Sequence, residues 1–324
     1  MKKNTNSKII TGALAVSLAA IMWGIDGVIL TPNLLNTDGF PLDATFVVFV
    51  LHCIPFIIMN AFWYKYYKML KQFSVSDYIY IISIALFGGM LGTFCIVKAL
   101  FLIDFQNLTI IALLQKLQPV FAIVLSVILL KEKISKNYFI FASLAIVAGY
   151  IMTFGFNAPT AVSKNVISAS LLALLAAFSF GASTVLSKKM LNKYPPMSIT
   201  FFRYGFTTVM ALLVVVITGV YTQFSITPLK TWIIFLIIAF TTGSGAILLY
   251  YYGLKNISAS LSTICELLFP ISAAILDYFI NDNTMTIVQW IAAAVMIFAI
   301  IALSKGAVSD NKMRENPKFV ARKS

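Results

Sequence analysis

The sequence predicts an all-α membrane protein with ten transmembrane helices in two inverted five-helix repeats. The first observation is composition: 60% of the 324 residues are hydrophobic and only 11% are charged, whereas an ordinary soluble domain has about 25% charged residues. The second is a series of ten apolar runs, each long enough to cross about 30 Å of hydrocarbon. The third is a weak internal repeat in which each half holds five of these runs.

The ten apolar runs are expected to be helices, because a segment in lipid must satisfy its own backbone polar groups. The N-terminal run has a basic start and small residues that would also suit a signal peptide, but the repeat requires it as a retained first span. The expected spans are residues 10–31, 44–63, 78–102, 107–130, 137–156, 167–186, 197–219, 231–252, 258–280 and 286–303.

Basic residues alternate with these spans. Nineteen of the 24 Lys and Arg residues fall on one side of the predicted bundle, two lie in loops on the other side, and three lie inside spans. The positive-inside rule therefore places both termini in the cytoplasm and the protein in the cell membrane. The net charge of +13 reflects this topology and does not indicate a nucleic-acid partner. The basic tail, residues 305–324, is expected to be a disordered cytoplasmic segment.

Three pairs of stretches carry the repeat. "LAAIMWG" resembles "LAAFSFG", "FVLHCIPF" aligns with "TFFRYGFT", and "LLQKLQP" aligns with "ICELLFP". The halves are residues 1–156 and 157–304, and each has an odd number of spans, so the second enters the membrane from the opposite side. Inverted repeats of this kind are common in secondary transporters that alternate access to a site near the midplane.

Together these features resemble the EamA branch of the drug/metabolite transporter superfamily. The resemblance covers residues 10–304 and rests on the five-plus-five arrangement, on "WGIDG" in the first span, and on "QPVFAIVLSVILLKEKIS" with its weaker echo "FPISAAILDYFINDN". It implies a ten-helix inverted-repeat transporter, commonly moving amino acids or other small metabolites, with a cavity lined by spans 1, 3, 4, 6, 8 and 9. The second span of this branch often carries arginine where this chain has His52.

Ionisable and amide groups at membrane depth are functional candidates, because burying them in lipid is costly. Gln115, Lys116 and Gln118 lie in the fourth span and Glu266 lies in the ninth; all four are predicted to bind substrate. Lys116 either lines the pathway or forms a structural ion pair with Glu266. Glu266 is also the first candidate for proton coupling or for binding a substrate ammonium group.

Two prolines occupy matching places in the repeat. Pro119 and Pro270 are predicted to kink the fourth and ninth spans, because proline lacks an N–H group and frees the carbonyl four residues earlier. Those carbonyls belong to Gln115 and Glu266. Interrupted helices at corresponding positions of two halves are typical of a transporter site.

Further substrate-binding candidates lie nearer the span ends. Lys98 in the third span either faces the cavity or snorkels to the interface. Its repeat counterpart is the tyrosine run 250–252, from which Tyr251 is predicted to line the cavity, with an interfacial aromatic belt as the alternative. Trp23 is the candidate from the first span, and Asp26, one turn later, is the second proton-coupling candidate.

Three other polar residues have structural explanations. Arg203 lies six residues inside the seventh span and is expected to snorkel to the cytoplasmic interface. His52, the single histidine, is expected to be a satisfied structural group. Glu132 follows the fourth span and is expected to cap a helix or pair with loop charges.

The sequence carries no Walker A, GxSxG or HExxH pattern, so it predicts neither ATP drive nor an enzyme. It predicts no cofactor and no metal site. The preferred function is a secondary transporter of an amino acid or similar zwitterion, driven by protons or by exchange. One alternative is a transporter of phosphorylated or nucleotide-linked metabolites held by Lys98 and Lys116; another is an integral-membrane enzyme or scaffold. The sequence does not define the oligomeric state.

Overall fold

The computed structural model describes residues 2–35, 42–102, 114, 115, 117–154, 164–281 and 286–315. Within these ranges the regular structure is helical and no strand occurs. Eight helical segments are long and apolar enough to cross a membrane. The chain is therefore an all-helical, multi-pass membrane protein, as its composition predicts.

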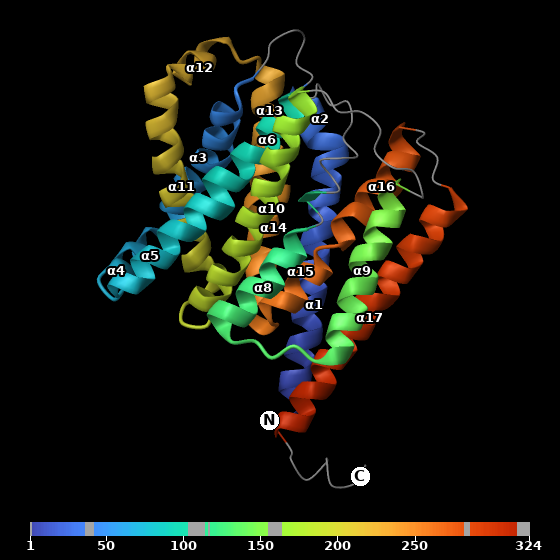
Figure 1. The fold of residues 1–324 in the computed structure, drawn as a ribbon. Coiled ribbons are helices and arrows are strands. Elements are labelled where there is room, and N and C mark those ends of the chain that lie inside the picture. Colours follow the sequence, from blue (N-terminus) through green and yellow to red (C-terminus); the bar gives the residue numbers. More distant parts are fainter. Residues whose placement is uncertain are drawn as a thin grey trace, which may run out of the picture.

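The helices follow one another with few long connections (Figure 1). In the first half they are α1 (Lys2–Ile25), η1 (Asp26–Leu30), α2 (Thr31–Leu35), α3 (Ala44–Trp63), η2 (Tyr64–Tyr66), α4 (Tyr67–Leu70), α5 (Val75–Ile84), η3 (Ala85–Leu91), α6 (Gly92–Leu102), α8 (Gln118–Leu130) and α9 (Lys136–Phe154). In the second half they are α10 (Lys164–Leu191), α11 (Pro196–Thr218), η4 (Val220–Thr222), α12 (Gln223–Ile226), α13 (Leu229–Ile238), η5 (Ala239–Gly243), α14 (Ser244–Asn256), α15 (Ala259–Cys265), α16 (Leu268–Asn281) and α17 (Ile287–Glu315). Of the η elements, η1, η3 and η5 are π-helical turns inside longer helices.

Eight of the ten expected spans correspond to the eight segments that meet the length and hydropathy requirements for crossing a membrane. The expected fourth and fifth spans correspond to shorter apolar helices, Gln118–Leu130 and Lys136–Ile151. Residues 103–113 and 116, which belong to the connection before the fourth span and to its first part, lie outside the described residues. The count of ten spans therefore stays a prediction.

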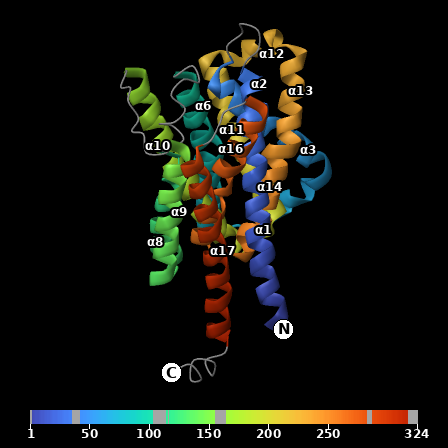
Figure 2. The same ribbon diagram turned by 90° about the vertical axis from the view of Figure 1, so that its right-hand side faces the viewer.

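The helices pack in a regular set of pairs. α1 packs against α14 and α16, and α10 packs against α6 and α8. α3 packs against α11, and α9 lies side by side with α17 along one flank of the bundle (Figures 1 and 2). Helices far apart in the sequence thus form every one of these contacts.

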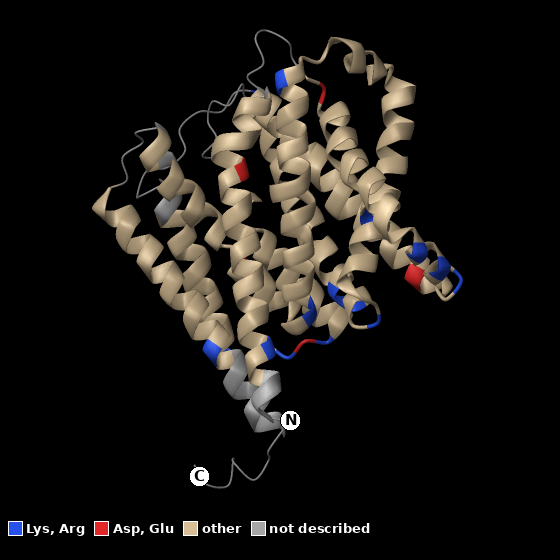
Figure 3. Cartoon of the chain, turned by 180° about the vertical axis from the view of Figure 1, so that it is seen from behind, with Lys and Arg blue, Asp and Glu red and all other residues tan. Residues whose placement is uncertain are grey.

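The N-terminal end of α1 and the C-terminal end of α17 lie at the same end of the bundle (Figures 1 and 2). Lys and Arg residues gather at this end, whereas the middle of the bundle is almost free of charge (Figure 3). Both described ends therefore lie at one end of the bundle, as expected for an even number of spans.

The basic tail differs from expectation. α17 continues to Glu315, so residues 305–315, which were expected to be disordered, are helical. The physical reason is local: this stretch contains Ala, Lys, Met, Arg and Glu, which favour helix, and the first proline after it is Pro317. Residues 316–324 lie outside the described part.

Small residues bring α1 close to its neighbours. A Cβ atom on Gly253 of α14 would lie 2.5 Å from the carbonyl oxygen of Gly12, and one on Gly24 would lie 1.9 Å from Oγ of Ser272 on α16. Only glycine permits such approaches. These contacts hold α1 between α14 and α16, and they fix the position of Trp23 in the interior.

Candidate functional site

The ninth expected span is broken where the prediction places a proline kink. α15 ends at Cys265, Glu266 and Leu267 form a turn, and α16 begins at the next residue, two positions before Pro270. The carbonyl of Glu266 was expected to lack a donor, but it accepts a hydrogen bond from the N–H of Phe269 at 2.9 Å. The tight turn therefore replaces the helical bond that proline removes, and the expected free acceptor is absent here.

The start of α8 shows a related turn. Leu117 forms it, with its N–H bonded to the carbonyl of Leu114 at 3.1 Å, and α8 then begins at Gln118 with Pro119 in its first turn. Proline suits this position because the first N–H groups of a helix have no intrahelical acceptor. Both turns place a polar side chain at an interruption in the middle of an apolar segment.

The two interruptions meet inside the bundle through Glu266. Nε2 of Gln118 donates to Oε2 of Glu266 at 2.6 Å, and the hydroxyl of Tyr250 donates to Oε1 at 2.8 Å. The Tyr250 oxygen lies 2.7 Å from Oγ1 of Thr184, so Thr184 donates to Tyr250. Both carboxylate oxygens of Glu266 are thus paired with neutral donors, and no charged partner is needed.

An aromatic side chain covers this group. The ring of Trp23 lies 5.4 Å from the ring of Tyr250 at an interplanar angle of 53°, and its indole Nε1 donates to the carbonyl of Thr242 at 3.1 Å. We call Trp23, Gln118, Thr184, Tyr250 and Glu266 the central cluster. Its members come from α1, α8, α10, α14 and the turn after α15, so both halves of the chain build it.

The central cluster contains three of the predicted site residues: Trp23, Gln118 and Glu266. Gln115 and Lys98 are each half-buried, and no hydrogen bond between described residues joins either of them to the cluster. Lys116 lies outside the described residues, so the predicted ion pair between Lys116 and Glu266 stays a prediction. The described residue of the fourth span that bonds to the Glu266 carboxylate is Gln118.

Tyr250 and Thr184 were not predicted from the sequence. Tyr251 was the predicted member of the run of three tyrosines, because the rotation of this helix does not follow from the sequence. A signal was nonetheless present: Gly253 lies three residues after Tyr250 and faces Gly12 of α1. Residues three apart share a helix face, so a glycine that marks the contact with α1 also turns Tyr250 toward Trp23.

Tyr251 belongs to a different hydrogen-bond network, although its ring lies 5.9 Å from that of Tyr250. Its hydroxyl lies 2.8 Å from Oγ of Ser187 and accepts from Nη1 of Arg203 at 3.0 Å. Nη2 of Arg203 donates to the carbonyl of Gly88 in the π-turn η3 at 2.6 Å. Tyr251 is fully buried, and its polar atom is used within the protein. The geometry gives it a structural position.

The expectation for Arg203 was wrong. Its side chain is only 8% exposed and does not snorkel, because the π-turn η3 offers carbonyl oxygens inside the bundle. The carbonyl of Ala85 in the same turn accepts from Thr207 at 3.0 Å. His52 behaves as expected: it is buried, and its Nδ1 lies 2.8 Å from the carbonyl of Val48.

Asp26 lies one turn after Trp23, in the π-turn η1. Its carboxyl group is close enough to Thr31 and Thr242 to interact with their side chains. Nevertheless Oδ1 of Asp26 and Oγ1 of Thr242 are both buried without a hydrogen-bond partner among the described residues. This pair adjoins the central cluster through the bond between Trp23 and the Thr242 carbonyl.

Glu132 caps a helix, as predicted, and the helix belongs to the other half of the chain. Its carboxylate accepts from the N–H groups of Ala259 and Ser260 at 2.8 and 3.2 Å, and from the Ser260 hydroxyl. Nζ of Lys188 donates to the carbonyl of Leu254 at 2.9 Å, at the end of α14. The Glu132 bonds join the two halves beyond α8 and α15, whereas the Lys188 bond joins α10 to α14 within the second half.

A second contact between the two halves involves the connection after α10. Lys193 forms an ion pair with Asp77 at 2.7 Å, and the hydrogen bond to this carboxylate raises the pKa of the Lys193 ammonium group. Asp77 in turn forms a capping box with Ser74 at the start of α5.

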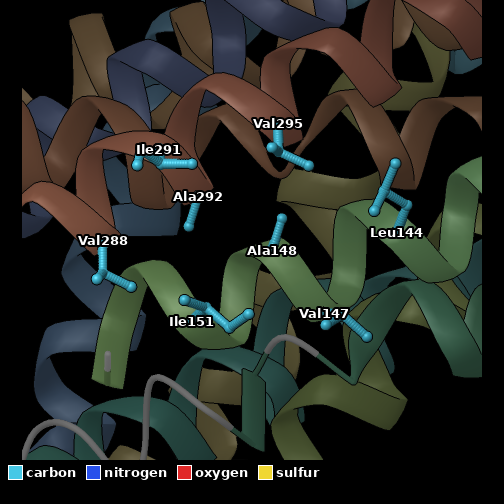
Figure 4. A pocket seen from close by; sticks show the side chains of 8 residues that line it. All are labelled: Leu144, Val147, Ala148, Ile151, Val288, Ile291, Ala292 and Val295. Carbon is cyan, nitrogen blue, oxygen red and sulfur yellow. The ribbon is translucent and has the colours of Figure 1, made fainter. Parts of the chain in front are cut away.

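One pocket lies away from the central cluster, between α9 and α17 (Figure 4). It has a volume of 330 Å³. Its lining is entirely aliphatic: Leu144, Val147, Ala148, Ile151, Val288, Ile291, Ala292 and Val295. Such a surface has no group that recognises a polar solute, so it is not the candidate site.

The fold and the central cluster define an integral membrane protein that holds a polar, aromatic site inside its helical bundle. The sequence pattern of the EamA-like transporter family matches this chain in two stretches, residues 10–154 and 167–305. The chain belongs to the EamA-like transporter family. It is therefore a transporter of small molecules and not an enzyme, as the sequence predicts.

One relative is named riboflavin transporter ImpX, from Fusobacterium nucleatum subsp. nucleatum. It is 48% identical to this chain over 298 residues, which cover 91% of this chain and 98% of that protein. A protein of known crystal structure has 15% identity and a TM-score of 0.65, covering 91% of this chain and 98% of its own. The second likeness shows a shared fold.

Proposed function

We propose that the protein transports riboflavin, or a closely related neutral flavin, across the cell membrane by alternating access between two inverted five-helix halves. The observation that carries this proposal is the row of polar groups Gln118, Glu266 and Tyr250, covered by Trp23. The name of the relative that shares 48% identity supports it.

The polar row matches one edge of a flavin ring. The imide edge presents a carbonyl, an N–H and a second carbonyl, which is an acceptor, a donor and an acceptor. Gln118 and Tyr250 are donors, and Glu266 between them is an acceptor. When the flavin enters, the two donors turn to its carbonyls and Glu266 accepts its N–H. Hydrogen bonds to a charged group contribute about 1.5–3 kcal/mol each.

Aromatic side chains suit the rest of the ring. The rings of Trp23 and Tyr250 lie at 53° to one another, so they are tilted and not stacked. A flat flavin ring that enters between them would present its faces to the two aromatic side chains. Aromatic pairs in such arrangements gain about 0.5–1.5 kcal/mol beyond the area they bury. The ribityl chain is rich in hydroxyl groups and would lie toward Gln115, which is half-buried on the same segment as Gln118.

Three observations support the inverted halves. The two family matches, residues 10–154 and 167–305, correspond to the predicted repeats. The helix contacts also follow the repeat. The first expected span contacts the eighth and ninth, and its counterpart in the second half, the sixth, contacts the third and fourth. Finally, η3 and η5 are π-turns in the third and eighth spans, at offsets close to that of the sequence repeat.

The concentration of basic residues at the end of the bundle near the termini supports a cytoplasmic location for that end (Figure 3). In this orientation the Glu132 cap and the Lys193–Asp77 ion pair join the two halves on the cytoplasmic side. These bonds must open in the inward-facing state, so they belong to the gate of the proposed cycle.

The amino-acid substrate expected from the sequence depended on Lys116 and Glu266 as a cation and an anion that are both available to a zwitterion. In the described residues Glu266 bonds to neutral donors, which favours a neutral substrate with an N–H group over a zwitterion. The phosphorylated alternative depended on Lys98 and Lys116, and no hydrogen bond between described residues joins Lys98 to the central cluster. Amino acids and a phosphorylated flavin therefore serve as competing compounds in the test.

The test is counterflow in proteoliposomes loaded with unlabelled riboflavin, with labelled riboflavin supplied outside. We expect labelled riboflavin to enter and unlabelled riboflavin or lumiflavin to compete. Flavin mononucleotide, a panel of amino acids and an N3-methylated flavin should compete poorly, because the first carries a phosphate, the second lacks the ring and the third lacks the imide N–H. Absence of riboflavin counterflow, or equal competition by amino acids, would contradict the proposal.

A further inference from the structure

Asp26 is a carboxyl group inside the bundle without a compensating charge. It lies in η1, and the elements packed against η1 are α1, α2, α13 and α16. The titratable residues of these elements whose side chains are described are Lys8 toward the far end of α1, Lys230, which is exposed at the start of α13, and Tyr278, which is 37% exposed on α16. None of these residues pairs with Asp26. The side chain of Asp277 lies outside the described residues.

Two buried polar atoms in this region lack hydrogen bonds. Oδ1 of Asp26 and Oγ1 of Thr242 have no partner among the described residues, and Thr242 is one of the side chains that act on the Asp26 carboxyl group. Thr242 is only 4% exposed. An unpaired buried polar atom costs about 1–3 kcal/mol, and native structures keep few of them without a functional reason.

We infer that Asp26 and Thr242 form the binding site of a coupling proton, and this inference rests on the proposed transport function. A proton bound at Oδ1 of Asp26 neutralises the buried charge. The new O–H group donates to Oγ1 of Thr242 once the two side chains approach to hydrogen-bond distance, and both unpaired atoms are then satisfied. The carboxylate takes it from water on one side of the membrane and returns it to water on the other, and no other group is oxidised or reduced.

Glu266, the first candidate for proton coupling in the sequence, is less suited to this role in the observed geometry. Both of its oxygens already accept hydrogen bonds, from Gln118 and from Tyr250. A proton added there would displace one of these donors. The structure thus divides the two roles: Glu266 recognises the substrate, and Asp26 carries the proton.

Trp23 provides the physical link between the two sites. Its ring packs against Tyr250 of the central cluster, and its indole N–H holds the backbone carbonyl of Thr242. A substrate that moves the Trp23 ring also moves Thr242 relative to Asp26. Both Asp26 and Thr242 lie in π-turns, which are frequently found at functional sites.

The experiment compares two transport modes in proteoliposomes, with Asp26→Asn as the test variant. Counterflow requires substrate binding and alternating access, whereas uphill accumulation also requires coupling to an ion gradient. With one coupled proton per riboflavin, a pH step of one unit sustains about tenfold accumulation. We expect D26N to retain counterflow and to lose accumulation, so that the concentration ratio falls to unity at every pH step.

Thr242→Val should weaken accumulation without abolishing counterflow, and Thr241→Val is the matched control. Thr241 lies in the same π-turn, but it is exposed and its hydroxyl bonds to the carbonyl of Ile237. Accumulation by wild type that follows a Na⁺ gradient at constant pH, or D26N that still accumulates riboflavin with the pH step, would overturn the inference. Absence of wild-type counterflow would instead overturn the proposed function, so the two failures can be told apart.

Discussion

Adjacent tyrosines of α14 offer a matched pair of substitutions that separates substrate recognition from structural support. Tyr250 donates to Glu266 in the central cluster, whereas Tyr251 accepts from Arg203 and contacts Ser187. Replacing either tyrosine with phenylalanine removes one hydroxyl and keeps the ring. The same chemical change should therefore have two different consequences.

In the Tyr250→Phe variant the flavin loses one donor to its imide edge, and Glu266 loses the donor that holds it in place. A hydrogen bond to a charged group is worth about 1.5–3 kcal/mol, and each 1.4 kcal/mol is tenfold in affinity. Riboflavin should accordingly bind roughly 10- to 150-fold more weakly to this variant. Thermal stability without ligand should also fall, because one oxygen of the buried Glu266 carboxylate loses its donor; the two variants are therefore distinguished by affinity.

In the Tyr251→Phe variant Arg203 keeps its bond to Gly88 but loses its other acceptor. A buried charged donor without a partner costs about 1–3 kcal/mol or more, so the variant should unfold at a lower temperature while its riboflavin affinity stays near that of wild type. Quenching of flavin fluorescence measures affinity, and a thermal-shift assay in detergent measures stability. Equal loss of affinity in both variants, or unchanged affinity in Y250F, would refute this reasoning.

Three further substitutions test the packing, the cap and the cluster. Gly253→Ala should destabilise the bundle by about 1–3 kcal/mol, because α1 leaves no room for a Cβ atom; Gly306→Ala, where no atom lies within 4 Å, should be neutral in the same denaturation assay. Glu132→Ala should lower the melting temperature, since it leaves the first N–H groups of α15 without their acceptor, whereas Lys133→Ala in the same exposed loop should not. Gln118→Leu should weaken riboflavin binding by a factor similar to that for Y250F, measured by fluorescence quenching; unchanged binding would remove Gln118 from the site.

Hydropathy alone predicted most of the fold. Lipid forces each apolar run to become a helix, so the eight long spans follow from composition and length. The polar residues that are costly in lipid were equally visible, and Gln118 and Glu266 were selected on that basis. Trp23 was selected from the first span, in the WGIDG stretch. The structure brings these three together around one tyrosine.

Helix rotation and local backbone geometry were the parts that the sequence could not provide. Tyr250 and Tyr251 are the same residue type at nearly the same depth in the span. Their different roles follow from the contact between α14 and α1, which sets the rotation of α14. Arg203 was expected at the interface because it lies only six residues inside the seventh span. A regular helix in the third span would use its own backbone carbonyl groups and offer no acceptor to the guanidinium group. The π-turn η3 breaks that assumption by turning the Gly88 carbonyl toward the guanidinium group.

The central claim is that a flavin ring binds beside Trp23 with its imide edge toward Gln118, Glu266 and Tyr250. A structure of the protein with riboflavin bound, determined by cryo-electron microscopy with a rigid fiducial fragment, tests it most directly. The account predicts density for the ring against the indole of Trp23, with the carboxylate of Glu266 at hydrogen-bond distance from the imide nitrogen. Riboflavin density in the aliphatic pocket between α9 and α17, with the central cluster unchanged, would contradict it.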